Sequence, residues 1–315
     1  MTKRERIKAA VSGQKPDQLP YSLWTHMPGI DLDPVLLAEK TYEFYKTYDV
    51  DFIKTMNNGM YAIEDFGCEI DYSDIEKGGV ARVIKTPVQN PEDWLSLKKC
   101  SCHEGSLHRE LSSLKLLLEK VKGEEVPVVF TVFSPATTAD KLSGKKMLSH
   151  IRSGHGEMVK KALEIITETT MEVAAEAIRL GADGIFFASQ MSSYDSMTAD
   201  EYVEYGRPYD LRVLEAAKDG WLNTLHAHGN NIMFEVLRDY PVSVFNWHAW
   251  ETLPDLDEAF CLTGKCLMGG LQRMDITNRN KNAIQHQIFE SFKQLKGLHQ
   301  ILTAASSAIR WMMRC

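Results

Sequence analysis

One stretch of the chain indicates the fold most clearly: Leu180-Gly181-Ala182-Asp183-Gly184-Ile185-Phe186-Phe187. Upstream of it, residues 157–180 place apolar side chains at helical spacing with charges on the opposite face, which predicts an amphipathic helix. Gly181 stands where a glycine commonly ends such a helix. The apolar run that follows predicts a short strand covered on both faces, as in a parallel sheet. The stretch therefore predicts a helix–strand connection of an α/β protein.

The same alternation recurs along the chain, with amphipathic stretches such as 34–48 and 200–218 between short apolar runs. The expected strands are 21–24, 51–54, 126–132, 184–187, 223–226, 242–247, 266–269 and 299–303. Eight strands that alternate with helices predict a (β/α)8 TIM barrel. An open doubly wound sheet is the competing topology. No G-x-G-x-x-G motif follows any of these strands, so a dinucleotide-binding version of that sheet has no support.

The domain organisation expected from the sequence is a single barrel domain over residues 1–315 with an N-terminal helix, since no linker or internal repeat divides the chain. The third strand is preceded by a charged insertion, 59–125, which we expect to carry a hairpin and helices of its own. After the last strand only a short tail remains, and we expect the C-terminal helix of the barrel to be truncated.

Composition excludes several function classes. The chain is 44% hydrophobic and 25% charged with a formal net charge of -7, which argues against binding to nucleic acid or to an anionic membrane. The N-terminus is charged and lacks the apolar run of a signal peptide. No apolar stretch approaches the roughly 18 residues that span a bilayer. We therefore expect a cytoplasmic protein.

The cysteines show no paired framework; they are Cys68, Cys100, Cys102, Cys261, Cys266 and Cys315. Cys100 and Cys102 form a C-x-C pair with His103 and His108 nearby, a combination that can bind metal. No second ligand pair follows at zinc-finger spacing, so the favoured interpretation is a surface loop with reduced thiols.

Four histidines, His26, His226, His228 and His248, fall at the ends of three predicted strands, where a β/α barrel collects its chemistry. His226 and His228 are two residues apart, so on a strand they share a face and reach one metal ion. Imidazoles suit zinc, with a third ligand from His248 or a carboxylate. Two other interpretations stay open: proton transfer or substrate anchoring, because histidine titrates near neutral pH, and a hydrogen-bonded network that supports the loops.

We take these four histidines as the candidate catalytic residues and expect further strand-end residues to bind substrate. Asn246 and Gln190 would orient it by hydrogen bonds. The expected substrate-binding set is Trp24, Lys54, Asn57, Gln190, Tyr194, Asn246, Trp247 and Gln272.

A series of motifs in order along nearly the whole chain carries a family resemblance. They are Arg4-Glu5-Arg6-Ile7-Lys8-Ala9-Ala10, Lys15-Pro16-Asp17-Gln18-Leu19-Pro20, Ala182-Asp183-Gly184-Ile185, Arg207-Pro208-Tyr209, Leu225-His226-Ala227-His228-Gly229-Asn230, Phe245-Asn246-Trp247-His248, Met268-Gly269-Gly270-Leu271 and Gln300-Ile301-Leu302-Thr303. Together they resemble the uroporphyrinogen decarboxylase superfamily. The resemblance implies a β/α barrel that often forms a homodimer.

The superfamily has two branches, and this chain departs from both. True decarboxylases carry an N-terminal arginine-rich segment for the carboxylates of uroporphyrinogen, but residues 21–29 contain no arginine. The branch similar to methylcobalamin:coenzyme M methyltransferase holds zinc with a His-x-Cys pair and a distant cysteine. Here His226-Ala227-His228 replaces the pair, and Ser307 stands where the distant cysteine would be. A change from thiolate to imidazole alters the softness and charge of the metal site.

The resemblance places the chain closer to the methyltransferase-like branch than to true decarboxylases. The leading hypothesis is corrinoid-linked methyl transfer, with zinc bound by His226 and His228 and a corrinoid carried on a partner protein. The runner-up is decarboxylation of uroporphyrinogen in porphyrin biosynthesis, which an arginine cluster at the mouth would indicate; Lys54 and Arg273 are its basic candidates. A third possibility is a non-catalytic barrel that binds a corrinoid or tetrapyrrole.

Overall fold

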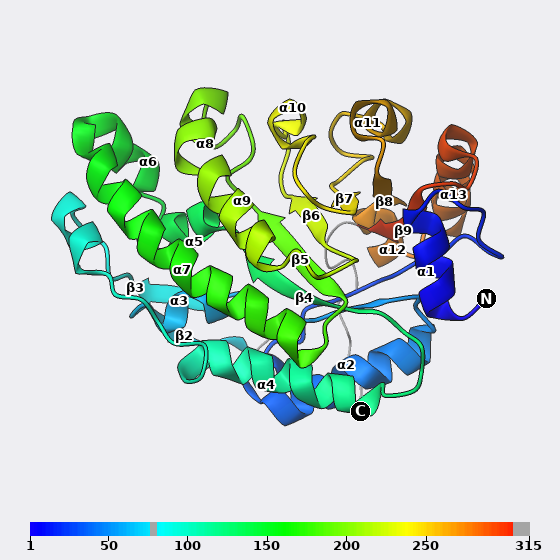
Figure 1. Ribbon diagram of the computed structural model, residues 1–315, viewed down its shortest axis with the longest axis horizontal. Coiled ribbons are helices and arrows are strands. Elements are labelled where there is room, and N and C mark those ends of the chain that lie inside the picture. Colours follow the sequence, from blue (N-terminus) through cyan, green and yellow to red (C-terminus); the bar gives the residue numbers. More distant parts are fainter. Residues whose placement is uncertain (76–80, 305–315) are drawn as a thin grey trace.

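A curled sheet of parallel strands surrounded by helices forms the centre of the computed structural model, which describes residues 1–75 and 81–304 (Figure 1). The strands follow one another in the order β1-β4-β5-β6-β7-β8-β9, and each neighbouring pair is parallel. They are β1 (Ile53–Lys54), β4 (Val128–Phe133), β5 (Gly184–Ser189), β6 (Thr224–Ala227), β7 (Val244–Asn246), β8 (Cys266–Leu271) and β9 (Gln300–Ala304). A separate hairpin pairs β2 (Glu69–Asp71) with β3 (Arg82–Lys85).

Helices connect successive strands of the sheet and cover its outer face (Figure 1). The α-helices are α1 (Lys3–Val11), α2 (Pro34–Tyr48), α3 (Tyr61–Glu64), α4 (Gly105–Lys120), α5 (Pro135–Leu142), α6 (Met147–His150), α7 (Gly156–Leu180), α8 (Ala199–Tyr205), α9 (Arg207–Ala216), α10 (Phe234–Leu237), α11 (Leu256–Thr263), α12 (Arg273–Thr277) and α13 (Lys281–Leu295). Shorter helical turns are η1 (Ile30–Leu32), η3 (Pro91–Ser96) and η4 (Ile151–His155).

The ends of several helices confirm signals visible in the sequence. Gly181 adopts the left-handed conformation at the end of α7, and its N–H bonds to the last carbonyls of that helix. The side chain of Asp33 accepts from the first amides of α2, with Pro34 in the first turn. Thr198 and Glu201 form a capping box at the start of α8. These local signals fix where the helices begin and end.

Side chains on the strands alternate between two packed layers. Outward residues of β4, such as Phe130 and Val132, join the core formed with the helices. Inward residues of β4, β5, β7, β8 and β9 meet in a second cluster together with Phe52, which directly precedes β1. These strand residues include Val129, Phe186, Val244, Met268 and Ile301. The ring of Trp24 contacts Phe186 on β5, with the ring centroids 5.4 Å apart. Residues from both edges and the middle of the sheet therefore share one interior, which shows that the sheet curls.

The number of strands differs from the prediction, because seven of the eight expected runs form strands of the sheet. Residues 21–24 make one isolated parallel bridge, between Tyr21 and Leu302 of β9. Toward β1, the main chain is joined by the bond from Asp51 N to Tyr21 O, and the next contact uses the Ser22 hydroxyl on Phe52 O. A side chain thus takes the place of the next ladder bond, so a regular eighth strand does not form here.

The segment 59–125 holds the β2–β3 hairpin, α3, η3 and α4, and α4 packs against α2 and α7. The predicted truncation of the last helix concerns residues after 304, outside the described residues. Among the described residues, no helix has the length and apolar character that crossing a membrane requires.

Candidate functional site

The carboxyl ends of β6 and β7 bring three of the predicted histidines together. His226 lies on β6 directly opposite Asn246 on β7, and both side chains point into the interior of the sheet. His228 and His248 each follow two residues later, so strand alternation returns their side chains to the same face. The His228 amide bonds to Ser189 O, which extends the pairing with β5 past the end of β6. We call this end of the sheet the mouth, and His226, His228 and His248 the histidine cluster.

The three rings of the histidine cluster are in mutual contact. Nε2 of His226 lies 3.3 Å from Nδ1 of His228. The ring centroids of His226 and His228 are 5.5 Å apart, those of His226 and His248 6.0 Å, and those of His228 and His248 5.4 Å. One ligating nitrogen from each residue lies within 4.8 Å of the others. His226 and His248 are buried, and His228 is half-buried.

Asn246 fixes the proton of His226. Its Nδ2 donates to Met268 O at 2.7 Å, so its Oδ1 is the atom that faces Nδ1 of His226, at 2.6 Å. A carbonyl oxygen only accepts, and Nδ1 of His226 must therefore carry the proton. The lone pair of His226 is then on Nε2, which points toward His228. An anchored ring with its free nitrogen turned inward is the arrangement that metal-binding histidines adopt.

The environment keeps the cluster uncharged near neutral pH. Burial, followed by the neighbouring His228 and His248, lowers the pKa of His226 well below its usual value. Burial also lowers the pKa of His248 to about 4, with smaller contributions from His228 and Arg273. The pKa of His228 is lowered by burial and by the charges of Arg273 and Lys141. Neutral imidazole is the form that binds a metal ion.

Two lysines, of which Lys54 is buried and Lys141 half-buried, face the same interior. Lys54 of β1 lies between aromatic rings, with Nζ 5.5 Å from the Trp24 centroid and 4.9 Å from that of Phe186. The same Phe186 ring stacks on His226, with centroids 5.2 Å apart. Burial lowers the pKa of Lys54 to about 7. Its Nζ donates to Thr55 O, a neutral acceptor.

Lys141 of α5 is the second of these cations. Its Nζ donates to Gly59 O and lies 4.3 Å from the Phe133 ring centroid, and burial lowers its pKa to about 8. Its charge contributes to the lowered pKa of His228. The mouth therefore combines neutral imidazoles with two lysines whose hydrogen bonds go to uncharged carbonyls.

The rim of the mouth is an open groove of about 730 Å³ beside His248. It is lined by Tyr194, Asn230, Asn231, Ile232, Ala249, Trp250, Glu251, Thr252 and Leu253. Glu251 links the groove to the cluster, because its Oε2 lies 3.9 Å from Nδ1 of His248 and 3.2 Å from Nη2 of Arg273. Tyr194, Trp250 and Leu253 expose large apolar surfaces there.

Two of the expected site residues lie outside the histidine cluster. His26 is exposed and does not join the cluster, but it lies near Lys54 and Lys141 of the mouth, whose charges act on it. Trp247, expected to bind substrate, does not face the mouth: its side chain is 1% exposed, packs in the outer core and donates to Pro254 O. Asn246 and Trp247 are adjacent on a strand, so only one of them can face the interior.

The remaining expected residues are held by the protein itself. Asn57 is buried and donates to Glu110 Oε2 at 2.9 Å, so it orients a carboxylate. Gln190 and Gln272 are half-buried at strand ends, where their main-chain amides bond to side chains of Thr137 and Gln287. The sequence analysis does not single out Lys141, Phe186 or Glu251. They lie in a helix, a hydrophobic strand and a loop respectively, where these residue types are common. Ser307, in the expected position of a distant ligand, is outside the described residues.

The donor set of the cluster fits a zinc ion. Catalytic zinc sites supply three protein ligands and leave a fourth position open. Two nitrogens bound to a tetrahedral ion at about 2.05 Å are about 3.3 Å apart, which is the spacing between His226 and His228. The third histidine and the hydrogen-bonded outer partner Asn246 complete the pattern.

Comparisons with known proteins agree with this architecture. The family model for uroporphyrinogen decarboxylase (URO-D) matches residues 2–305. The chain is 26% identical over 243 residues to the methylcobamide:CoM methyltransferase MtbA of Methanosarcina acetivorans, a match covering 73% of this chain and 70% of that one. The Methanosarcina mazei MtbA is 25% identical over the same lengths. A solved methyltransferase from Methanosarcina mazei covers 98% of this chain and 94% of its own, with TM-score 0.81 and 18% identity, a likeness of fold.

Proposed function

The chain belongs to the uroporphyrinogen decarboxylase (URO-D) family, and from that premise we propose that it transfers a methyl group between a corrinoid and a thiol at the histidine cluster. Three relatives in this comparison are named methylcobamide:CoM methyltransferases, which supports the methyl-transfer branch over decarboxylation. The corrinoid would be presented by a partner protein, and the thiol would enter the mouth.

The observation that carries the proposal is the convergence of three neutral histidines with one free nitrogen already turned inward. His226, His228 and His248 would hold a zinc ion. When bound, zinc acts as a Lewis acid that stabilises a thiol as its thiolate, the nucleophilic form. Asn246 keeps the proton of His226 on Nδ1, so that Nε2 stays available without a change of tautomer.

The surroundings of the cluster favour an acceptor with an acidic group. Lys54 is buried and Lys141 is half-buried, and both donate to uncharged carbonyl oxygens, while the charge of Asp140 also acts on Lys141. Burial disfavours the charged form of Lys54, so a bound carboxylate or sulfonate would stabilise its ammonium form. The aromatic rings of Trp24 and Phe186 form apolar walls beside Lys54 and would exclude water from the reacting sulfur.

The groove on the rim suits the methyl donor. A corrinoid is a broad macrocycle with apolar faces, and Tyr194, Trp250 and Leu253 expose apolar surface beside His248. A methyl group carried above the groove would approach a thiol held at the cluster. Proximity of donor and acceptor is the main contribution that such a site makes to a transfer reaction.

The test combines metal analysis with a transfer assay on the purified protein. Wild type and His228→Ala are compared for zinc content and for methyl transfer from methylcobalamin to coenzyme M. His286→Ala, which removes an exposed histidine on α13, is the matched control. We expect His228→Ala to bind one zinc less per chain and to lose at least about 100-fold in rate, while the control behaves as wild type.

Equal zinc content and equal rates in wild type and His228→Ala would contradict the proposal. Decarboxylation of uroporphyrinogen by the same preparation, without methyl transfer, would support the runner-up activity instead. Tight corrinoid binding without turnover of either substrate would identify a binding protein.

A further inference from the structure

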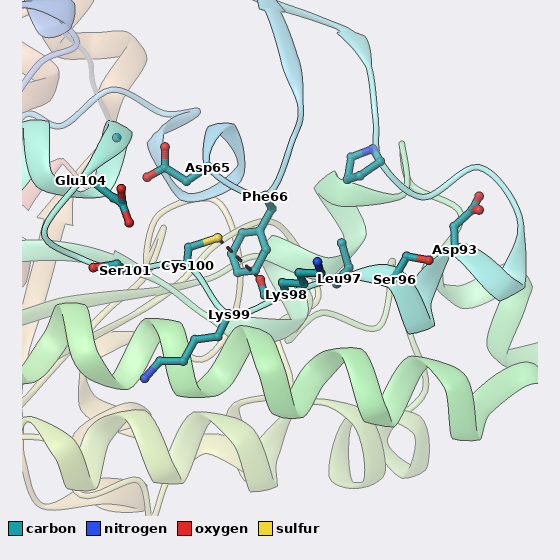
Figure 2. Close-up of a pocket in the computed structure, with 12 residues that line it drawn as sticks. Asp65, Phe66, Asp93, Ser96, Leu97, Lys98, Lys99, Cys100, Ser101 and Glu104 are labelled. Atoms are coloured by element: carbon teal, nitrogen blue, oxygen red, sulfur yellow. Dashed lines mark hydrogen bonds between the residues drawn. The ribbon is translucent and has the colours of Figure 1, made fainter.

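A second group of metal-ligating side chains lies outside the mouth, where the segment before α4 runs along the long helix α7. Figure 2 shows this segment, with Lys99 extending from it toward the helix and Cys100 and Ser101 following. It lines an open pocket of about 590 Å³ together with Asp65 and Phe66 of the preceding segment. Cys102 and His103 come next in the chain.

The segment is attached to α7 at two points one helical turn apart. The Cys100 amide donates to Thr169 Oγ1 at 3.1 Å, and the Cys102 amide donates to Glu172 Oε1 at 3.4 Å. The His103 amide donates to Ser101 Oγ, which closes a tight turn. Lys99 Nζ adds an ion pair to Glu172 Oε2 at 2.7 Å. Cys102 and His103 are therefore held in a defined position before any ligand arrives.

The side chains at this point form a mixed sulfur, nitrogen and oxygen donor set. Sγ of Cys102 lies 3.8 and 4.0 Å from the two ring nitrogens of His103. One ligating atom each from Cys102, His103 and Glu172 lies within 4.8 Å of the others. Cys102 is 1% exposed, His103 is exposed and Glu172 is half-buried, so the group has a protected floor and an open side. We propose that Cys102, His103 and Glu172 bind a divalent metal ion of the zinc type.

A metal ion at this group takes the place of the thiol proton of Cys102 and binds the sulfur together with the Glu172 carboxylate. Release of a thiol proton is the usual course of zinc binding by cysteine.

The charges around the group fit a cation. Glu176 lies one turn along α7 from Glu172, and its pKa is lowered by Arg179 and also by the nearby His103. Two carboxylates thus flank the imidazole. Lys99, which pairs with Glu172, has a largely exposed side chain that can turn toward solvent when an ion binds. Sulfur, imidazole and carboxylate together suit zinc better than calcium or magnesium, which prefer oxygen alone.

This site is independent of the proposed methyl transfer. It joins the 59–125 segment to α7, so a bound ion would clamp that segment to the barrel and stabilise the protein without entering the reaction. The sulfur ligand also gives it a spectroscopic signature, because a thiolate bound to cobalt(II) produces a charge-transfer absorption in the near ultraviolet. The histidine cluster contains no thiol and does not produce that band.

The experiment is a titration of metal-free full-length protein with cobalt(II) chloride, followed by near-ultraviolet absorption, with thermal unfolding in the presence of zinc as a second readout. Wild type is compared with Cys102→Ser and with His103→Ala, which alters an exposed side chain and keeps the thiol. Cys100→Ser, Cys261→Ser and His228→Ala are the controls. We expect one equivalent of the band in wild type and all controls, none in Cys102→Ser, and at least tenfold weaker binding in His103→Ala.

Because the histidine cluster would also bind zinc, the thermal readout is taken in the His228→Ala background. There the zinc-dependent rise in melting temperature should be lost on adding Cys102→Ser and kept on adding Cys100→Ser, since an ion that binds only the folded state stabilises it. Absence of the band in wild type at saturating cobalt would overturn the inference. A band that survives in Cys102→Ser, or that disappears in Cys100→Ser or Cys261→Ser, would also overturn it.

Discussion

Asn246 is the residue through which the fold sets the chemistry of the histidine cluster. Its Oδ1 accepts a hydrogen bond from Nδ1 of His226, and its Nδ2 donates one to Met268 O. One side chain therefore joins β6, β7 and β8. The apolar Leu of similar size removes both bonds and keeps the packing. Outer hydrogen-bond partners of metal ligands typically contribute about 10–100-fold to metal affinity.

We therefore predict that Asn246→Leu weakens zinc binding at the cluster by about 10–100-fold, because His226 is no longer held in the tautomer with a free Nε2. Competition with a chromophoric chelator measures the affinity. The variant Asn57→Leu is the comparison, since Asn57 serves Glu110 and does not contact the cluster. Unchanged affinity in Asn246→Leu would show that the ring is positioned by other contacts.

The lowered pKa values of the cluster predict how stability depends on pH. An unfolded histidine takes up a proton near pH 6.5, whereas the folded cluster resists it, with the pKa of His248 near 4. The folded state then binds fewer protons than the unfolded state between these values. The contribution of these histidines to the free energy of unfolding is fully present above pH 6.5 and is lost as the pH falls toward 4.

For metal-free protein we expect His248 alone to account for a loss of about 1 kcal/mol between pH 7.5 and 5.5. Denaturant unfolding at these two pH values measures it. His248→Gln should reduce the loss by about that amount, and His286→Gln, at an exposed position, should leave it unchanged. A pH dependence identical in all three proteins would contradict the assignment.

At this scale the sequence predicted part of the site, and strand geometry explains which part. His226, His228 and Asn246 follow from alternation along β6 and β7, a local property. The same alternation turns Trp247 away from the interior, because its neighbour Asn246 faces it. Lys141 and Glu172 belong to helices, and only the folded chain shows that they approach His228 and Cys102. Contacts of this kind leave no pattern in a single sequence.

At the scale of elements, Gly184 at the start of β5 lies against the backbone of the segment that leads into β6. A Cβ at this position would lie 2.4 Å from Leu222 C and 2.6 Å from Leu222 O, both backbone atoms. That segment must move to admit it, and it leads directly into the strand that carries His226 and pairs with β5. Gly184 is thus required by the close approach of this backbone.

We predict that Gly184→Ala lowers the free energy of unfolding by on the order of 2 kcal/mol. Gly59→Ala is the matched control, because a Cβ there meets nothing within 4 Å, and its effect should stay within about 0.5 kcal/mol. Urea unfolding of the three proteins gives the comparison. Equal stability of both variants would mean that this segment moves without cost.

Elements marked by local signals are the ones that the sequence predicts well. Gly181 ends α7 as predicted, and Asp33 and Thr198 cap α2 and α8 in the same local way, each through its own side chain. Residues 21–24 carry an equally apolar run, yet they form a single bridge. Their pairing depends on β1 and β9, which lie far apart along the chain, and the Ser22 hydroxyl takes the place of a ladder bond.

For the whole molecule, the decisive question is how the two edges of the sheet are joined. The N-terminal helix α1 contributes at one end: Arg4 pairs with Asp183 beside β5, and Arg6 pairs with Asp51 beside β1. Residues 20–22 lie between the edges themselves. Leu302 N donates to Pro20 O, Ser22 N donates to Leu302 O, and Asp51 N donates to Tyr21 O. A seven-stranded sheet is thereby connected edge to edge through one short segment.

If that connection is stable, the barrel is closed in solution. The amides that form it then exchange only when the core itself unfolds. We predict that the amides of Ser22, Asp51 and Leu302 exchange with deuterium as slowly as those of Leu267 and Met268 in β8. Site-resolved hydrogen exchange measures this directly, with the amide of the exposed loop residue Lys15 as a fast reference. Fast exchange at Ser22 and Asp51 beside slow exchange in β8 would describe an open curled sheet. The histidine cluster would then rest mainly on β5 to β8, since within residues 1–75 and 81–304 its hydrogen bonds to Asn246 and between His226 and His228, and its stacking on Phe186, come from these strands and the loops that follow them.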